Sequence, residues 1–494
     1  MTAGEANSNS AKTNRDTMVK SAKVSTTNTS VSTSATGIPP LTTDISSKRT
    51  VLGSLVKVVA VISLLGAVAA QRYLSQGPYT PWTCSVFGYK CERRYDVPFH
   101  GYVHDDYSSA EQAFKDNFFA GEDVGAAVAA YVKGELVMDM QGGWQNVKER
   151  TPYSNESLQL VFSSTKVFTS IVVAQFVGKG VISYDEKIAT YWPEFAQGNK
   201  ENVTLGDLMV HAGGVGFIDV PITSAEAEDP ERFSRILAAQ PHNFGGVRTR
   251  SYHASTYGWY VNEILKRTAN CTVDDVAAEF NKDYDIEWYL KPYQLKFDNR
   301  ISPFYTSTPL YRFSRLIKFV GGPVKFLRLL FEKNDAKAKT FKLPLEGTPA
   351  LLEYNLQLRR IEAPAYSGFT NARSIAKLAA MMANDGKAIM DGEPDLLTRE
   401  GYAVATKPAP VAFDMIIQRS MPQERGGWGK FDDFVIGGVE FTGWAGMGGS
   451  VFMWNSEHKI GFGYCMNGIP DPSSPDDRSI SILRALVKQV LKKK

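Results

Sequence analysis

The stretch that decides the fold is YSNESLQLVFSSTKVFTSIVVAQFVGKGVISYDEKIATYWPEF, residues 153–195. Its middle joins a strand-like run, LQLVFS, to an apolar segment that predicts a buried helix ending near 178–180. Ser163 and Lys166 lie at this junction, and residues three apart on a helix share a face, so the lysine amine can reach the serine hydroxyl. Backbone N–H groups at the first helical turn stabilise a nearby anion. The junction therefore predicts a nucleophilic serine activated by a lysine whose pKa is lowered by desolvation or by another cation.

The Ser-x-x-Lys pattern needs this context, because it occurs at Ser54/Lys57, Ser163/Lys166, Ser374/Lys377 and Ser456/Lys459. The first pair lies in a long apolar segment and the last in a predicted hairpin turn, where the helical geometry fails. Ser374 and Lys377 lie in NARSIAKLAAMMANDG, which is a credible helix, so two pairs stay open on pattern alone. The strand-like run before Ser163 favours that serine, because a strand-to-helix junction holds it rigidly in the floor of a cleft.

Composition and missing motifs exclude several classes of protein. The chain has 494 residues with 55 basic against 52 acidic side chains and no basic block, so no nucleic acid is expected as a partner. GxSxG, HExxH, P-loop and GxGxxG motifs are missing. Six single histidines and four cysteines without a CxxC pair predict no metal and no organic cofactor. Cys84 and Cys91 are close enough to bridge in an oxidising compartment, whereas Cys271 and Cys465 are expected to be lone core thiols.

The N-terminal part of the chain predicts a membrane tether. Residues 1–49 are rich in Ser, Thr, Asn and Ala and are expected to be disordered, because they bury too little apolar surface. VLGSLVKVVAVISLLGAVAA, residues 51–70, is long enough to cross a bilayer, so we expect a transmembrane anchor over 50–72 and a linker over 73–100. A buried core helix and a cleaved targeting peptide are the alternatives. The disordered leader argues against the first and its length against the second.

The sequence leaves the side of the membrane open. Basic residues flank the apolar segment at both ends, so the positive-inside rule does not decide the orientation. Asn155, Asn202 and Asn270 begin glycosylation sequons, although chance gives a similar number. Together with the Cys84/Cys91 pair they favour a lumenal or extracellular catalytic domain. A mitochondrial membrane is less favoured, because the leader has few arginines and several acidic residues.

Residues 101–494 have the pattern of a globular domain. Residues 108–121 have helical apolar spacing, and the alternating run after them predicts a β-hairpin with its turn at 133–134. Two strands joined at 455–459 precede a C-terminal amphipathic helix. Helices at both ends with strands between them predict an antiparallel sheet covered by terminal helices. Residues 283–350 form a predicted insertion, whose basic and aromatic side chains fit either packing on the domain or a helical pair on the membrane surface.

Five further blocks occur in order along the chain: EDVGAAVAAYVKGELVMDMQGGW, VTLGDLMVHAGGVG, YHASTYGW, GFTNARSIAKLAAMMANDG and GMGGSVFMWNSEHKIGFGYCMN. Together with residues 153–195 they resemble the class C β-lactamase-like serine hydrolases and the family VIII carboxylesterases. The resemblance begins near residue 101 and is broken mainly by 283–350. It implies an α/β fold of the α+β sandwich type, the β-lactamase/transpeptidase-like fold, with an antiparallel sheet flanked by terminal helices and an all-α subdomain.

The resemblance assigns catalytic roles to three residues. It implies Ser163 as the acylated nucleophile and Lys166 as the proton acceptor. The second family motif begins with a tyrosine, matched by Tyr252 in Tyr252-His253-Ala254, which would shuttle the proton during acylation and deacylation, its phenol pKa depressed by the nearby cation. Ala254 replaces an asparagine that contacts the substrate amide in β-lactam-active relatives, so lactamase and peptidase activities are less favoured.

The third motif of the family, Lys- or His-x-Gly on an edge strand, is matched by Trp444-x-Gly446. A tryptophan offers an apolar face and one indole donor in place of a cation, which suits a neutral ester. By the same resemblance, the backbone N–H groups of Ser163 and Met447 would form the oxyanion hole. His211, which matches a histidine of the family, is expected to be a structural turn residue.

The sequence thus predicts a membrane-anchored serine hydrolase that cleaves an ester or a small amide through an acyl-enzyme on Ser163. Its expected partners are a small-molecule substrate, the membrane through the 51–70 helix and, as an option, further copies in a homo-oligomer. Two alternatives stay open. One is a catalytically weak or inactive assembly protein on the same fold, and the other is a β-lactamase or D-amino-acid peptidase. Ser163, Lys166 and Tyr252 together speak against the first alternative.

Overall fold

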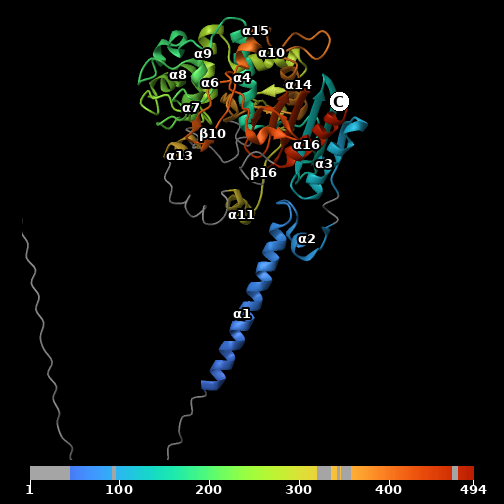
Figure 1. The fold of residues 1–494 in the computed structure, drawn as a ribbon. Coiled ribbons are helices and arrows are strands. Elements are labelled where there is room, and N and C mark those ends of the chain that lie inside the picture. Colours follow the sequence, from blue (N-terminus) through green and yellow to red (C-terminus); the bar gives the residue numbers. More distant parts are fainter. Residues whose placement is uncertain are drawn as a thin grey trace, which may run out of the picture. The chain divides into compact units, whose positions relative to one another are not determined.

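The computed structural model describes residues 45–91, 96–319, 335–341, 345, 358–469 and 477–493. The chain divides into two units, Met1–Leu64 and Leu65–Lys494 (Figure 1). The predicted disordered tail, residues 1–49, lies outside the described residues except for its last five, which begin a helix.

Helix α1, Ile45–Leu74, begins before the predicted anchor at 50–72 and ends two residues after it. Its apolar part, Leu52–Leu74, has 23 residues with a mean hydropathy of 2.2. A helix rises about 1.5 Å per residue, so this part is long enough to cross the ~30 Å hydrocarbon core of a bilayer. Length and composition therefore agree with the predicted span.

The second unit is built on an antiparallel sheet with strand order β1-β3-β2-β15-β14-β13. Its strands are β1 (Phe99–Val103), β2 (Gly125–Val132), β3 (Glu135–Asn146), β13 (Thr442–Ala445), β14 (Val451–Asn455) and β15 (Ile460–Met466), with β4 (Thr151–Pro152) paired to β3. The hairpin predicted at 133–134 is confirmed, since both turn residues have the positive φ that a tight hairpin turn requires. The second predicted hairpin joins β14 to β15, and pairing of β15 with β2 brings the two ends of the domain together.

Helices cover the sheet as the sequence predicts. The terminal helices α3 (Ser108–Phe119) and α16 (Asp477–Lys492) pack on each other, and α14 (Ala372–Ala383) packs on β15 and β2 (Figure 1). The contact between α14 and β15 is close because β15 carries glycines there. A Cβ added at Gly461 would lie 2.3 Å from the backbone of Ala380. This sheet with its helical layers is the fold that positions the candidate site.

The remaining helices form the predicted all-α part. They are α4 (Thr165–Gly178), α5 (Ile188–Tyr191), α6 (Leu205–Met209), α7 (Ser224–Glu228), α8 (Pro230–Ala239), α9 (Tyr257–Ala269), α10 (Val273–Asp283) and α15 (Arg399–Ala405). Helix α4 is the buried helix predicted after Ser163, and ten successive residues from Thr165 to Ala174 are buried in it. A helix that is apolar on all sides in this way belongs in the centre of a domain.

The predicted insertion at 283–350 is partly integrated into the domain. Strand β6 (Trp288–Tyr289) pairs with β8 (Phe369–Thr370), β7 (Tyr305–Thr306) pairs with β16 (Gly468–Ile469), and the ring of Trp288 stacks on Phe168 of α4 at 4.5 Å. Helices α11 (Pro309–Phe319) and α13 (Asp335–Phe341) follow, and the rest of the predicted helical pair lies outside the described residues. Residues 288–289 and 305–306 of the predicted insertion therefore pair with strands of the domain.

Cys84 and Cys91, whose bridge the sequence left open, form a disulfide around helix α2 (Trp82–Phe87). Cys465 is fully buried in β15, as the sequence predicts. Cys271 is only partly buried, because it precedes the N-cap of α10 and is not in the core as expected.

Candidate active site

Ser163 lies in a single 3₁₀ turn, Phe162–Ser164, between strand β5 (Gln159–Leu160) and helix α4. Phe162 has a φ of 45°, a conformation that costs free energy for a bulky residue. The turn persists because its surroundings hold it: the Ser450 hydroxyl donates to the Val161 carbonyl at 2.7 Å and pairs with the Ser164 hydroxyl at 3.0 Å. Ser163 itself is partly exposed while Phe162 and Ser164 are buried, so its hydroxyl is presented from a rigid support.

Lys166 lies on the first turn of α4 and reaches Ser163 as the i, i+3 spacing predicts. Its Nζ lies 3.4 Å from Ser163 Oγ and donates to the carbonyl oxygens of Ala254 at 2.8 Å and Ala365 at 2.9 Å. Burial of the side chain, which is 3% exposed, lowers the pKa of the Lys166 amine well below its ordinary value. A neutral amine has two N–H groups and one lone pair. The two carbonyls take both N–H groups, so the lone pair is left for Ser163 Oγ.

Tyr252 completes the group of three predicted residues from a distant part of the chain. Its hydroxyl donates to Ser163 Oγ at 2.7 Å, and its ring lies beneath Lys166 Nζ at 4.8 Å from the centroid. The expectation that the cation would depress the phenol pKa is wrong. Burial dominates and raises the pKa of Tyr252 above its ordinary value. The raised pKa favours the neutral Tyr252 hydroxyl, which donates the hydrogen bond to Ser163 Oγ.

Trp444, at the position of the family's cation, forms an aromatic wall with Tyr252. The two rings stack at 5.7 Å with an interplanar angle of 13°, and Phe431 packs edge-on against Trp444 at 5.0 Å. Trp444 is 6% exposed, so it offers the site an apolar surface without charge. Ala254, at the position of the family's asparagine, contributes its backbone carbonyl to Lys166.

His211 is the structural turn residue that the sequence predicts. Its φ is 62°, its carbonyl accepts the Ser251 N–H at 2.8 Å, and its Nδ1 accepts the His253 N–H at 3.3 Å. These two bonds bracket Tyr252, and the His211 ring packs edge-on against the Tyr252 ring at 4.9 Å. His253 is fully buried, and its pKa falls to about 4 through desolvation, so this histidine is neutral near pH 7. The pair therefore orients Tyr252 and carries no charge.

Gly446 and Met447 lie in a turn that follows β13 and packs against Val161. A Cβ on Gly446 would lie 2.1 Å from the Val161 carbonyl oxygen, so only glycine fits at this position. The Gly449 N–H donates to the Gly446 carbonyl at 3.1 Å and closes the turn, in which Met447 is 41% exposed. The turn therefore packs against Val161, which precedes Ser163 by two residues in the chain.

Arg478 supports this turn and is a residue that the sequence analysis missed. It lies on α16, is 3% exposed, and donates to the Gly448 carbonyl at 2.6 Å and to Asp123 at 2.7 Å. Asp123 in turn accepts the Tyr464 hydroxyl at 2.6 Å. The C-terminal helix thus fixes the glycine turn through a buried ion pair. The only sequence signal was an arginine within the apolar period of an amphipathic helix.

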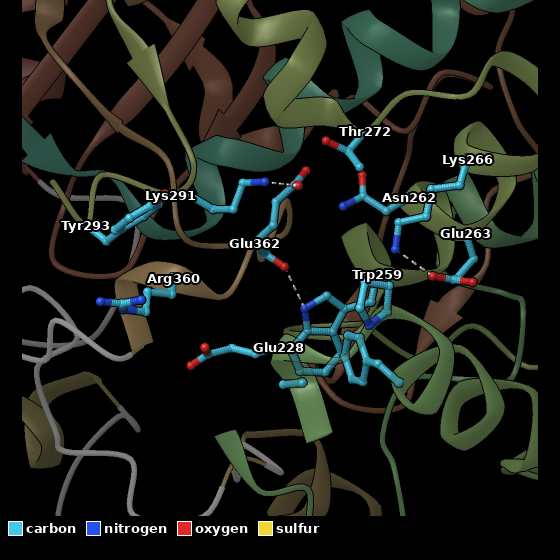
Figure 2. Close-up of a pocket in the computed structure, with 13 residues that line it drawn as sticks. Glu228, Trp259, Asn262, Glu263, Lys266, Thr272, Lys291, Tyr293, Arg360 and Glu362 are labelled. Carbon is cyan, nitrogen blue, oxygen red and sulfur yellow. Dashed lines mark hydrogen bonds and ion pairs between the residues drawn. The ribbon is translucent and has the colours of Figure 1, made fainter. Parts of the chain in front are cut away.

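A cavity of about 360 Å³ lies among α7, α8, α9 and the segments 291–293 and 360–362 (Figure 2). In it Lys291 Nζ lies 3.4 Å from the Glu362 carboxylate, and the Trp259 indole donates to the Glu362 carbonyl at 3.1 Å. None of the predicted site residues lines this cavity. Within the described part of the chain, no group of three or more His, Cys, Asp or Glu side chains is arranged to hold a metal ion.

The second unit is similar to proteins of a known family. Residues 112–279 match the Beta-lactamase family, and this range contains Ser163, Lys166 and Tyr252. The chain contains a beta-lactamase family domain. It is similar to the esterase/beta-lactamase LipL of Mycobacterium tuberculosis, with 25% identity over 276 residues, which are 56% of this chain and 62% of that protein.

Two solved structures share the fold of the second unit. A penicillin-binding protein homologue from Caulobacter crescentus superimposes with a TM-score of 0.68 and 24% identity, over 79% of this chain and all of that chain. A family VIII carboxylesterase superimposes with a TM-score of 0.64 and 24% identity, over the same shares of the two chains. The predicted resemblance and the β-lactamase/transpeptidase-like fold, with its mixed helices and antiparallel sheet, are confirmed.

Proposed function

We propose that this protein is a serine hydrolase that cleaves an ester or a small amide through an acyl-enzyme on Ser163. The observation that carries the proposal is the position of one hydroxyl between two groups: Ser163 Oγ lies 2.7 Å from the Tyr252 hydroxyl and 3.4 Å from Lys166 Nζ. The family domain and the esterase relatives support the same reaction class.

In the proposed mechanism Lys166 is the general base. Tyr252 donates to Ser163 Oγ, so the proton of the serine is directed to the free lone pair of the lysine amine. As that proton moves, Oγ attacks the substrate carbonyl carbon, and the oxygen that becomes negative is bound by the N–H groups of Ser163 and Met447. Tyr252 protonates the leaving oxygen or nitrogen and recovers its proton from Lys166. Water then repeats the sequence on the acyl-enzyme and releases the acid.

The walls of the site favour a neutral substrate. Trp444 presents an apolar surface where a lysine or histidine would bind a carboxylate, and Ala254 has no side-chain amide for a β-lactam or peptide amide. Esters are therefore the preferred class. Hydrolysis of a chromogenic cephalosporin at a rate that rivals a short-chain ester would favour the β-lactamase alternative, which the name of the LipL relative also includes.

A fluorophosphonate probe tests the nucleophile directly. The wild-type chain should be labelled on Ser163, and Ser163→Ala should abolish the labelling. Ser374→Ala is the matched control, because it removes the serine of the other helical Ser-x-x-Lys pair and should leave the labelling intact. Equal labelling of wild type and Ser163→Ala would contradict the proposal. If the probe did not label the wild-type chain and electron microscopy showed polymers, the assembly alternative would be favoured.

We further propose that α1 anchors the protein in a membrane with the catalytic domain on the lumenal or extracellular side. The 23 apolar residues of Leu52–Leu74 support the span, and the Cys84–Cys91 disulfide supports an oxidising compartment. The chain should resist extraction by alkaline carbonate and dissolve in detergent. Its electrophoretic mobility should increase after glycosidase treatment if the sequons at Asn155, Asn202 and Asn270 are used. Extraction by carbonate alone would contradict the anchor.

A further inference from the structure

The start of the segment that the sequence predicts as a linker, residues 73–100, is hydrogen-bonded to the rest of the second unit. The Gly77 N–H donates to the Ala120 carbonyl at 3.0 Å, and the Tyr79 N–H donates to the Gly121 carbonyl at 2.9 Å. The Tyr79 hydroxyl also donates to the Tyr305 carbonyl at 2.7 Å. Three hydrogen bonds therefore fix this segment to the loop after α3 and to strand β7.

The last turn of α1 is also tied to the start of helix α11. The hydroxyls of Tyr73 and Thr308 lie 2.9 Å apart, and α11 begins at the next residue, Pro309. Leu310 is therefore two residues along the chain from Thr308, which contacts the last turn of α1.

Large apolar side chains are exposed on both sides of this junction. In and after α2, Trp82 is 62% exposed, Phe87 is 70% exposed and Tyr89 is 59% exposed. On α11, Leu310 is 52% exposed. Trp82 and Phe87 contact each other edge-on at 5.8 Å, and the Cys84–Cys91 disulfide closes the loop that carries them. Tryptophan and tyrosine are the side chains that favour the interface between lipid and water.

The charged side chains on the two chain segments at the junction are of one sign. Within residues 65–91 and 305–314 the exposed charged side chains are Arg72, Lys90 and Arg312. Neither segment contains an acidic residue. A basic and aromatic surface of this composition matches the negatively charged headgroups of a membrane leaflet.

We propose that Trp82, Phe87, Tyr89 and Leu310 form an apolar platform that inserts into the interfacial layer of the bilayer that α1 spans. The proposal rests on the anchoring role of α1 and adds a second contact with the lipid. The hydrogen bonds of Gly77 and Tyr79 connect the platform to the loop after α3. A platform inserted in the lipid therefore holds the domain at the membrane surface.

Bromine-labelled lipids test the platform in the full chain. The protein is reconstituted in phosphatidylcholine/phosphatidylserine vesicles whose acyl chains carry bromine near the headgroup, which quenches only tryptophans that reach the lipid. In a Trp82→Phe background, Leu310→Trp adds one emitter on the platform. Val181→Trp is the matched control, because Val181 is an exposed apolar residue that follows α4 near α15, and α15 and α11 lie at opposite ends of the domain in Figure 1.

We expect the emission added by Leu310→Trp to be quenched about twofold and that added by Val181→Trp to be unaffected. Equal quenching of the two variants in vesicles that carry the protein on flotation would overturn the platform and leave the anchor intact. Failure of the wild-type chain to float with the vesicles would overturn the anchor. Emission from Leu310→Trp that is blue-shifted but insensitive to bromine would show a protein partner on this surface and would also overturn the platform. Circular dichroism confirms that the variants fold.

Discussion

Two Ser-x-x-Lys pairs lie at helix starts in this domain, and their lysines have different partners. Lys166, 3% exposed, contacts two backbone carbonyls and the Ser163 hydroxyl. Lys377, 5% exposed, forms an ion pair with the Glu393 carboxylate at 2.5 Å. A buried ammonium is stable only beside an opposite charge, so Lys377 serves as a structural cation. Lys166 has no such charge among its contacts, and burial favours its neutral, basic form.

The two serines differ in the same way. The hydroxyl of Ser374 accepts the Glu287 N–H at 2.8 Å, and the side chain is 4% exposed. Ser163 is partly exposed, and its Oγ is approached by a hydroxyl and an amine. The same four-residue pattern therefore supports structure at one place and chemistry at the other. The difference lies in the side chains and backbone groups that other parts of the chain place beside each pair.

Replacing each lysine with methionine gives the largest expected effect. If the two variants behaved alike, Lys166 and Lys377 would not have different roles. Lys166→Met should lower the rate of ester hydrolysis by about 10⁴-fold, because the base is lost. Lys377→Met should leave the rate of the folded enzyme unchanged but lower the free energy of unfolding by about 3 kcal/mol, because the Glu393 carboxylate stays buried without its partner. Hydrolysis of p-nitrophenyl butyrate and urea unfolding measure the two effects. An equal loss of rate in both variants would contradict the assignment.

Tyr252→Phe should have the next largest effect, about 10²-fold on the rate for an alkyl ester, because the leaving alkoxide loses its proton donor. The loss should be smaller for a p-nitrophenyl ester, whose leaving group needs no proton. Tyr257→Phe is the control, since the Tyr257 hydroxyl bonds to Ser170 at 2.7 Å and not to Ser163. A loss that is independent of the leaving group would assign Tyr252 to positioning alone.

Arg478→Lys tests whether the glycine turn at 446–449 must be held in place for catalysis. Lysine keeps a charge beside Asp123 but does not reproduce the fork that also reaches the Gly448 carbonyl. We expect kcat for ester hydrolysis to fall about tenfold with little change in KM, because the oxyanion donors are displaced and not removed. Arg373→Lys, at a half-exposed ion pair with Asp139, should change neither constant. A rise in KM alone would contradict this role.

The pH dependence of stability gives the smallest effect. Folding lowers the pKa of Lys166, so between that pKa and about 10.4 the unfolded chain binds one proton more than the folded chain. The free energy of unfolding then rises with pH by up to about 1.4 kcal/mol per unit in this window. Lys166→Met lacks this slope and should be stabilised most, relative to wild type, at the lower pH values. Urea unfolding at pH 7, 8 and 9 measures the free energy of unfolding of both proteins. If this free energy changed with pH by the same amount in the two proteins, Lys166 would be charged in the folded state.

The sequence alone predicted the strands and terminal helices, the Ser163/Lys166 pair and the apolar segment. These features depend on local periodicity: the i, i+3 spacing of Ser163 and Lys166, the alternation of the hairpin at 133–134, and the 23-residue apolar run. The family resemblance added Tyr252 and Trp444, whose distance from Ser163 in the chain no local pattern bridges.

Only the tertiary structure decided how the site is charged and supported. Whether a phenol pKa rises or falls depends on the balance between burial and a nearby cation, and sequence spacing contains neither quantity, so the expectation for Tyr252 had the wrong sign. Arg478 supports the glycine turn from a helix thirty residues further along the chain, as its bond to Gly448 records. The same holds for residues 73–80, which are a linker by composition and a fixed part of the domain by their hydrogen bonds. Burial and hydrogen bonding are properties of the packed chain, and they distinguish the surroundings of two Ser-x-x-Lys pairs that the pattern alone does not separate.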